Sequence, residues 1–279
     1  MEYKVNFRLI ILIGFLYTIK LNYMKVFNIP RLPINLERNL DKKLNDRDVP
    51  GIEMEYLWPE NCPRNLFSGA FVAAGTDGLA VSFCAETPYN RISAVRTEPK
   101  TSVFNEDCLE LFIQPENSSI YYGFEINPKD ACLDYRVFVE PEKNNTEDVI
   151  KNLPSYKSGH FYDEGEKVTG LLSTEVAGVN LTFDYDWQSK AVYHSTFDDE
   201  FWYLELFIPW SDFGLNEMPA AGAVWHGTLN RIDAAENQRR SKKAERVPGL
   251  QCLLDETKIP AFHQPGKFAE FCFTDSVSD

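Results

Sequence analysis

The chain has 279 residues and a formal net charge of -14, and 44% of its residues are hydrophobic. This length suits one large β domain with long loops, or two smaller domains, and the apolar content is enough for a sizeable core. The strongly acidic balance excludes nucleic acid and anionic membrane surfaces as partners, because like charges repel.

The N-terminal segment, residues 1–27, contains an apolar run at 9–17 that follows Lys4 and Arg8, as in the hydrophobic region of a signal peptide. No small-residue cleavage site follows, and the run is shorter than the roughly 20 residues that span a bilayer. Two alternatives stay open. Either the segment is a signal or anchor and the protein is membrane-anchored or extracytoplasmic, or translation starts at Met24 and the protein is cytoplasmic.

Residues 28–54 are charged and interrupted by prolines, and we interpret them as a lead-in to a domain that covers 55–275. The first predicted hairpin of this domain joins 67–74 to 79–86 through the turn Gly75-Thr-Asp-Gly78. The Asp-Gly pair predicts a tight turn, because glycine adopts the positive φ that such turns require.

Two runs, 104–115 and 121–128, alternate apolar and polar residues, and each ends at a proline. This pattern is typical of neighbouring antiparallel strands. In the first run the apolar residues at 109, 111 and 113 share one face and Glu110 lies on the other. In the second run Glu125 and Asn127 lie opposite the apolar face.

A similar run at 201–210 places Glu205 opposite its core residues. We therefore expect one sheet face with carboxylates beside aromatic rings, which suits a sugar because its hydroxyls need acceptors and its C–H faces stack on rings. A glycosidase would need two of the three glutamates Glu110, Glu125 and Glu205 at about 5–9 Å. An ordinary solvated sheet face shows the same pattern, and we favour this interpretation over a catalytic pair of glutamates.

Three further segments predict strands: a pair at 168–183 broken at Gly178, a glycine-led strand at 220–233, and a terminal strand at 262–273. The sequence thus predicts an all-β protein, an antiparallel β-sandwich.

The five tryptophans divide into two groups. Trp202 and Trp225 share the parity of core residues. Trp58, Trp187 and Trp210 lie in or beside loops, where a partly exposed indole can serve as a binding platform.

The sequence gives only weak indications of a metal or cofactor site. Its six cysteines lack Cys-x-x-Cys spacing, which favours free buried thiols over zinc, a redox pair or a disulfide framework. Acidic clusters at 184–186, 198–200 and 255–256 offer oxygen ligands for Ca²⁺, although plain acidic turns are favoured. Haem binding lacks a convincing set of methionine and histidine ligands, so we expect no cofactor, with calcium as the one alternative.

Five pieces in order resemble the carbohydrate-binding module family 9-like domains. They are Asp107-Cys-Leu-Glu110, Phe124-Glu-Ile-Asn127-Pro, Trp202…Glu205…Ile208-Pro-Trp210, Trp225…Asn230-Arg231 and Phe262-His263…Pro265…Phe268…Phe273. The resemblance covers about 55–274. It implies an immunoglobulin-like or jelly-roll-like sandwich, related to the dopamine-β-monooxygenase N-terminal-like domains. It also implies non-catalytic carbohydrate binding, often beside enzymes that degrade xylan or other polysaccharides.

The expected partner is a mono- or oligosaccharide, and the alternative function is a glycoside hydrolase. The ligand-binding candidates, from the resemblance and the sheet pattern together, are Trp58, Glu110, Glu125, Asn127, Asn230, Arg231 and His263. Two departures from the family pattern concern its sugar sandwich. Cys252-Leu-Leu-Asp255 stands where an aromatic residue is common, and Ala269 replaces the usual glycine.

Overall fold

The computed structural model describes residues 26–37, 44, 49–56, 66–87, 92–140, 167–233, 250–251 and 262–275. The apolar run at 9–17 and Met24 lie outside these ranges. Among the described residues no helix is long and apolar enough to cross a membrane. The described chain is nearly all β, as predicted.

The described residues form fifteen strands and three short 3₁₀ turns. The strands are β1 (Val26–Arg31), β2 (Gly51–Glu53), β3 (Glu55–Tyr56), β4 (Ser68–Ala74), β5 (Gly78–Glu86), β6 (Cys108–Gln114), β7 (Ile120–Ile126), β8 (Cys132–Glu140), β9 (Leu171–Val176), β10 (Val179–Asp184), β11 (Val192–Phe197), β12 (Phe201–Pro209), β13 (Val224–Ile232), β14 (Leu250–Gln251) and β15 (Ala269–Asp275). The 3₁₀ turns are η3 (Val103–Asn105), η4 (Trp210–Phe213) and η5 (Pro265–Lys267).

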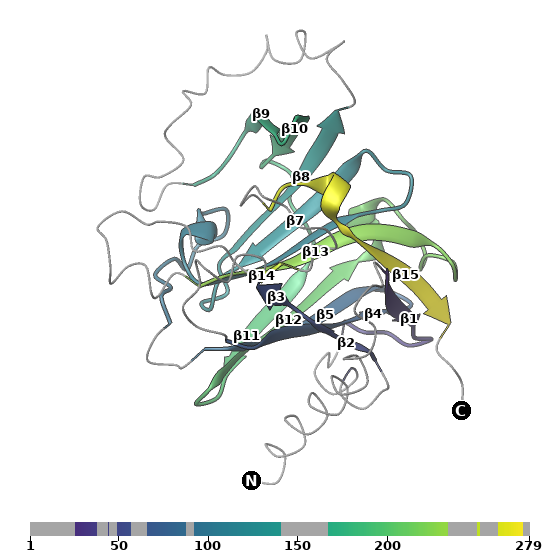
Figure 1. Cartoon of the computed structure of the whole chain (residues 1–279), viewed down its shortest axis with the longest axis horizontal. Helices are drawn as coiled ribbons and strands as arrows, with labels where there is room; N and C mark the ends of the chain where they lie inside the picture. The colour runs from purple at the N-terminus through teal and green to yellow at the C-terminus, as the bar shows by residue number, and fades with distance from the viewer. Residues whose placement is uncertain are drawn as a thin grey trace.

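The strands pair in the order β11-β12-β5-β4-β1-β15-β13-β6-β7-β8-β10-β9. The path folds over at β1 and β15, so that β12, β5 and β4 face β13, β6 and β7 in two layers (Figure 1). The predicted antiparallel sandwich is confirmed with one difference. Strand β1 runs parallel to both of its neighbours, β4 and β15.

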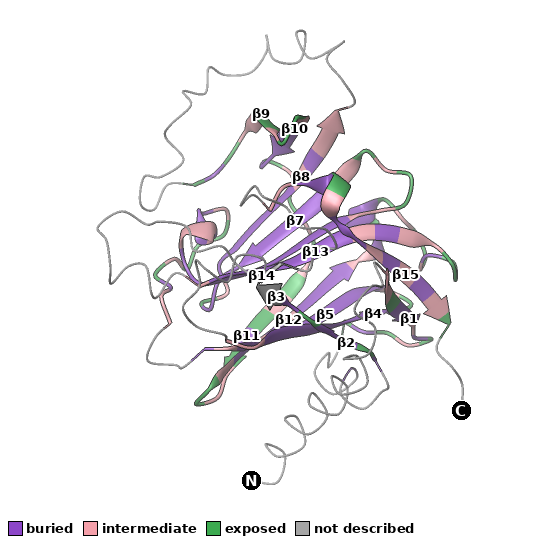
Figure 2. Cartoon of the chain, viewed as in Figure 1, coloured by how far each residue is buried: buried purple, intermediate pink, exposed green. Residues whose placement is uncertain are grey.

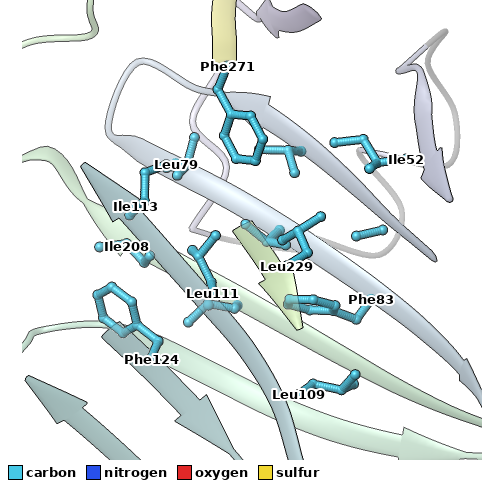
Figure 3. Close-up of a cluster of buried hydrophobic side chains, with 14 of the residues drawn as sticks. Ile52, Leu79, Phe83, Leu109, Leu111, Ile113, Phe124, Ile208, Leu229 and Phe271 are labelled. Carbon is cyan, nitrogen blue, oxygen red and sulfur yellow. The ribbon is translucent and has the colours of Figure 1, made fainter. Parts of the chain in front are cut away.

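The main core lies between the two layers. Leu109 and Leu111 of β6 and Leu229 of β13 meet Phe83 and Ile208 from the opposite layer (Figure 3). Each of these side chains is at most 1% exposed. The predicted parity of 109, 111 and 113 is therefore confirmed, because alternate residues of a strand point to one face of the sheet.

A second apolar cluster covers the outer face of the layer that contains β6, β7 and β8. It includes Phe112, Tyr121, Tyr135, Phe183 and Phe268, all nearly or fully buried. Purple therefore runs along β7 and β13, whereas green marks exposed residues on the edge strand β11 (Figure 2). The expectation of a solvated sheet face here is wrong, because the segment around η5 packs against it.

The hairpin of β4 and β5 is confirmed, but its glycines act differently from the prediction. The glycines of the described chain with positive φ are Gly170, Gly178, Gly214 and Gly222. Gly78 is required for close packing instead, because an added Cβ would lie 2.3 Å from the carbonyl oxygen of Ile208. The predicted break at Gly178 is confirmed as the turn between β9 and β10.

Trp202 and Trp225 are buried in the core, as predicted. Trp210 was expected as a partly exposed platform, and this is wrong. It lies in η4, is 3% exposed, and its Nε1 donates to the carbonyl oxygen of Gly75 at 3.0 Å. Trp187 is half-buried, with its ring centroid 5.2 Å from that of Tyr122.

Candidate functional site

The structure brings together three of the predicted ligand-binding residues on the outer face of the β13-β6-β7 ladder. Glu110 on β6 pairs directly with Glu125 on β7 and with Asn230 on β13. The amide nitrogen of Asn230 donates to Oε2 of Glu110 at 3.1 Å. Like charges directly opposite each other destabilise a sheet. Hydrogen-bond donors beside the two carboxylates are therefore needed to offset their repulsion.

Tyr135 of β8 is one such donor, and the sequence reasoning missed it. Its hydroxyl donates to Oε1 of Glu125 at 2.6 Å. Burial raises the pKa of Tyr135 well above its usual value, and the nearby Glu125 adds to the rise. The phenol therefore stays protonated at neutral pH and stays a donor. The signal in the sequence was the alternation along β8, which gives Tyr135 the same facing as Glu125.

Predicted residue His263 joins the aromatic side of this face. Its ring stacks on Phe112 with centroids 4.5 Å apart and an interplanar angle of 14°. Its Nδ1 lies 2.9 Å from the hydroxyl oxygen of Tyr121. Rings and carboxylates thus share one sheet face, as the sequence indicated, and both glutamates are less than 5% exposed.

Asn127 lies at the end of β7 and organises the turn to β8. Its Oδ1 accepts from the backbone nitrogens of Lys129 and Ala131 at 2.9 and 3.0 Å. Its Nδ2 donates to Glu106 at 2.8 Å and to the carbonyl oxygen of Arg96 at 2.9 Å. These bonds give Asn127 a structural role in this turn.

Arg231 was expected beside Asn230 near the two glutamates, and the structure corrects this grouping. Consecutive strand residues point to opposite faces, so Arg231 points between the layers and is 4% exposed. Its guanidinium donates to Ser68 Oγ, to the carbonyl oxygen of Glu86 and to Thr87 Oγ1, each at 2.8 Å. Arg231 therefore ties β13 to the opposite layer.

Two other predicted residues do not join this face. Glu205 was expected on a strand beside Glu110 and Glu125, but β12 belongs to the other layer, where Ser82 Oγ donates to Glu205 at 2.6 Å. Trp58 lies outside the described residues.

The acidic clusters within the described ranges serve as turn acceptors. Asp184 accepts from Arg136 Nε at 2.9 Å and from the backbone nitrogens of Asp186 and Trp187 at 3.2 Å. Asp198 accepts from the backbone nitrogens of Glu200 and Phe201. Within the described chain no group of three or more histidine, cysteine, aspartate or glutamate side chains is arranged to hold a metal ion. The cluster at 255–256 lies outside these ranges.

Four cysteines fall in the described chain, and all four are free. Burial raises the pKa of the thiols of Cys84, Cys108 and Cys132. These thiols stay protonated at neutral pH, and they pack as small apolar groups. Cys62 and Cys252 lie outside the described residues.

The family resemblance is confirmed by a direct match. Residues 41–158, which include Glu110 and Glu125, match the model of carbohydrate-binding family 9. No curated protein matches the chain.

Solved structures share the fold. A protein from Bacteroides uniformis, described with a proposed carbohydrate-binding role, has a TM-score of 0.58 at 13% identity, over 89% of this chain and 98% of that one. A family 9 module from Caldicellulosiruptor kristjanssonii, in complex with glucose, has a TM-score of 0.52 at 10% identity, over 91% and 98%. A family 9 module from the same organism, in complex with cellotriose, has a TM-score of 0.52 at 10% identity, over 91% of this chain and 95% of that one.

Proposed function

We propose that this protein binds a neutral mono- or oligosaccharide without cleaving it, and that the sugar reaches Glu110, Glu125 and Asn230 when the segment around η5, which covers their sheet face, moves aside. The observation that carries the proposal is the direct pairing of the two glutamates across β6 and β7, beside Asn230. Vicinal hydroxyls of a sugar are donors, and two neighbouring carboxylates are strong acceptors for them.

The aromatic side of the same face supports the proposal. Phe112, Tyr121 and His263 form a stacked group next to the glutamates. Phe112 and Tyr121 are fully buried, with His263 stacked on Phe112. Once this cover has moved, their rings supply flat apolar surface against which the C–H groups of a sugar ring can pack. The match to family 9 and the glucose and cellotriose complexes of its structural neighbour point to the same class of ligand.

A link to polysaccharide catabolism, and to xylan in particular, forms a second part of the proposal. Its basis is the frequent association of family 9-like domains with enzymes that degrade xylan or other polysaccharides. Binding of xylotriose in preference to cellotriose would support it, and binding of cellotriose alone would contradict it.

Calorimetric titration with glucose, cellotriose and xylotriose tests the main proposal. The key variant is Glu110→Gln, which keeps the shape and the acceptor for Asn230 but removes the charge. A hydrogen bond to a charged group contributes about 1.5–3 kcal/mol, so we expect affinity to fall about 10- to 150-fold. The matched control is Glu175→Gln on the exposed edge strand β9, which should bind as the wild type does.

The same samples are assayed for release of reducing ends. Release that disappears in Glu110→Gln would replace the binding module with a glycoside hydrolase. Equal affinities of the two glutamine variants would remove the sheet face from the proposal. Thermal unfolding of each variant checks that both remain folded.

A further inference from the structure

A cleft of about 500 Å³ opens at a different place, beside the start of β8. Its walls come from three separate stretches of chain, 99–100, 167–169 and 185–193, together with Cys132 and Asp134. This volume falls in the range of small-molecule sites, about 300–1,000 Å³. None of the predicted ligand-binding residues lines it.

The floor of the cleft is a neutralised ion pair. The ammonium of Lys100 lies 2.7 Å from Oδ1 of Asp134 and also donates to the carbonyl oxygens of Asp134 and Trp187. Lys100 has a φ of 60°, a conformation that L residues other than glycine rarely adopt. Lys100 thus has a strained backbone conformation, and Asp134 in the wall of the cleft neutralises its charge.

The rim formed by 186–190 is fixed at successive backbone positions by carboxylates from three elements. Asp184 accepts from the nitrogens of residues 186 and 187, Asp134 accepts from Ser189 at 2.6 Å, and Asp212 accepts from Lys190 at 2.7 Å. Across the gap, the nitrogen of Gly170 donates to Asp186 at 2.8 Å. A rim fixed in this way is formed before a ligand arrives, which lowers the entropy cost of binding.

The groups that line the cleft define the class of ligand. The charges balance, because Lys100 is paired with Asp134 and the rim carries one lysine, Lys167, and one aspartate, Asp186. The remaining polar groups are hydroxyls and an amide, and Tyr185 and Tyr193 contribute rings. The lining polar groups at the rim are Thr169, Gln188, Ser189 and Tyr193. Hydroxyls and amides beside rings suit a ligand with many hydroxyls and no net charge.

We propose that this cleft is a second binding site for a short neutral oligosaccharide, separate from the sheet face of the proposed function. The two sites have different linings, one with paired glutamates and the other with balanced charges beside hydroxyl and amide groups. A chain with both sites would contact a polysaccharide at two places, which raises its apparent affinity for a long glycan over that for a short one.

Amide chemical shifts of the labelled protein, recorded during titration with xylotriose and with cellotriose, test the proposal. We expect shifts at the amides of 188–189 that saturate with their own dissociation constant. The double variant Thr169→Ala with Gln188→Ala removes two exposed rim groups, and the cleft dissociation constant should rise about tenfold. Glu175→Gln is again the control, and Glu110→Gln should leave the cleft shifts unchanged.

The outcomes separate the two sites. If only the sheet face responds and the cleft amides do not move at saturation, the second site is refuted and the proposed function stands. If the cleft responds and Glu110→Gln binds as the wild type does, the cleft is the binding site and the sheet face is refuted. Silence at both places refutes both. Binding of glucuronate in preference to glucose at the cleft would overturn the neutral class of ligand.

Discussion

The variant Gly123→Ala tests how tightly the covered sheet face is packed. Gly123 on β7 pairs with Tyr135 on β8, and a Cβ at this position would lie 2.4 Å from two ring carbons of Tyr135 and 2.7 Å from its hydroxyl oxygen. Ordinary contact begins at 3.4 Å, so the ring must move by about 1 Å. Phe183 and Tyr185 stand in its way, with ring centroids 5.7 and 5.2 Å from that of Tyr135.

The expected loss in the free energy of unfolding follows from three contributions. Overpacking costs about 1–3 kcal/mol, and weakening the bond from Tyr135 to the Glu125 carboxylate costs up to about 1.5–3 kcal/mol. Replacing glycine by alanine returns about 0.4–1 kcal/mol through the unfolded chain. We therefore expect a net loss of about 2–5 kcal/mol, a large part of the stability of a typical domain.

Urea denaturation followed by tryptophan fluorescence measures this loss. The matched control is Gly266→Ala, where an added Cβ meets nothing within 4 Å and φ is not in the positive range; it should stay within about 0.5 kcal/mol of the wild type. Adding Tyr135→Leu to Gly123→Ala should recover part of the loss, as a coupling of at least about 1 kcal/mol. A Gly123→Ala protein as stable as the control would refute this packing argument.

Three further predictions concern buried polar groups. Arg231→Ala should lower stability by about 3 kcal/mol or more, because it leaves buried acceptors unsatisfied, while saccharide affinity of the folded protein stays unchanged; weaker binding without a loss of stability would contradict this. Burial raises the pKa of Asp212 above 3.8. The folded state therefore binds this proton more tightly than the unfolded state does. The free energy of unfolding falls as the pH rises from 3.8 through the folded pKa. Asp212→Asn should therefore gain stability relative to the wild type as pH rises above 3.8 in denaturation curves, and a constant difference would be the contrary result. The thiols of Cys84, Cys108 and Cys132 should resist a thiol reagent at pH 8 until the protein is unfolded, and rapid reaction in the native state would show that they are not buried.

The facing of residues along each strand could be predicted from the sequence, because a period of two decides which side chains meet the core. This rule placed residues 109, 111 and 113 on the face that meets the main core, and Glu110 and Glu125 together on the opposite face of the same layer. The same rule, applied strictly, also separates Asn230 from Arg231, because consecutive residues face opposite ways. Because Asn230 and Arg231 are neighbours in the sequence, they were expected to act together, but the alternation of side chains along the strand puts them on opposite faces.

Other features depend on long-range packing and leave little local trace. Nothing near Trp210 in the sequence shows that a 3₁₀ turn carries it into the core between the layers. The cover over Phe112 comes from a segment about 150 residues further along the chain, at His263. The cleft beside Lys100 combines three distant stretches, so only the folded chain brings its lining together.

The position of β1 has a consequence for the order of events on the ribosome. This strand, made early, lies between β4 and β15 and pairs along its length with residues 270–275. Until β15 leaves the exit tunnel, one side of β1 and the edge of β13 at 224–227 have no partner strand. Unpaired edges of this kind recruit strands from other nascent chains. Because β15 is the last strand to be made, these edges stay open to such pairing through most of the synthesis of the chain.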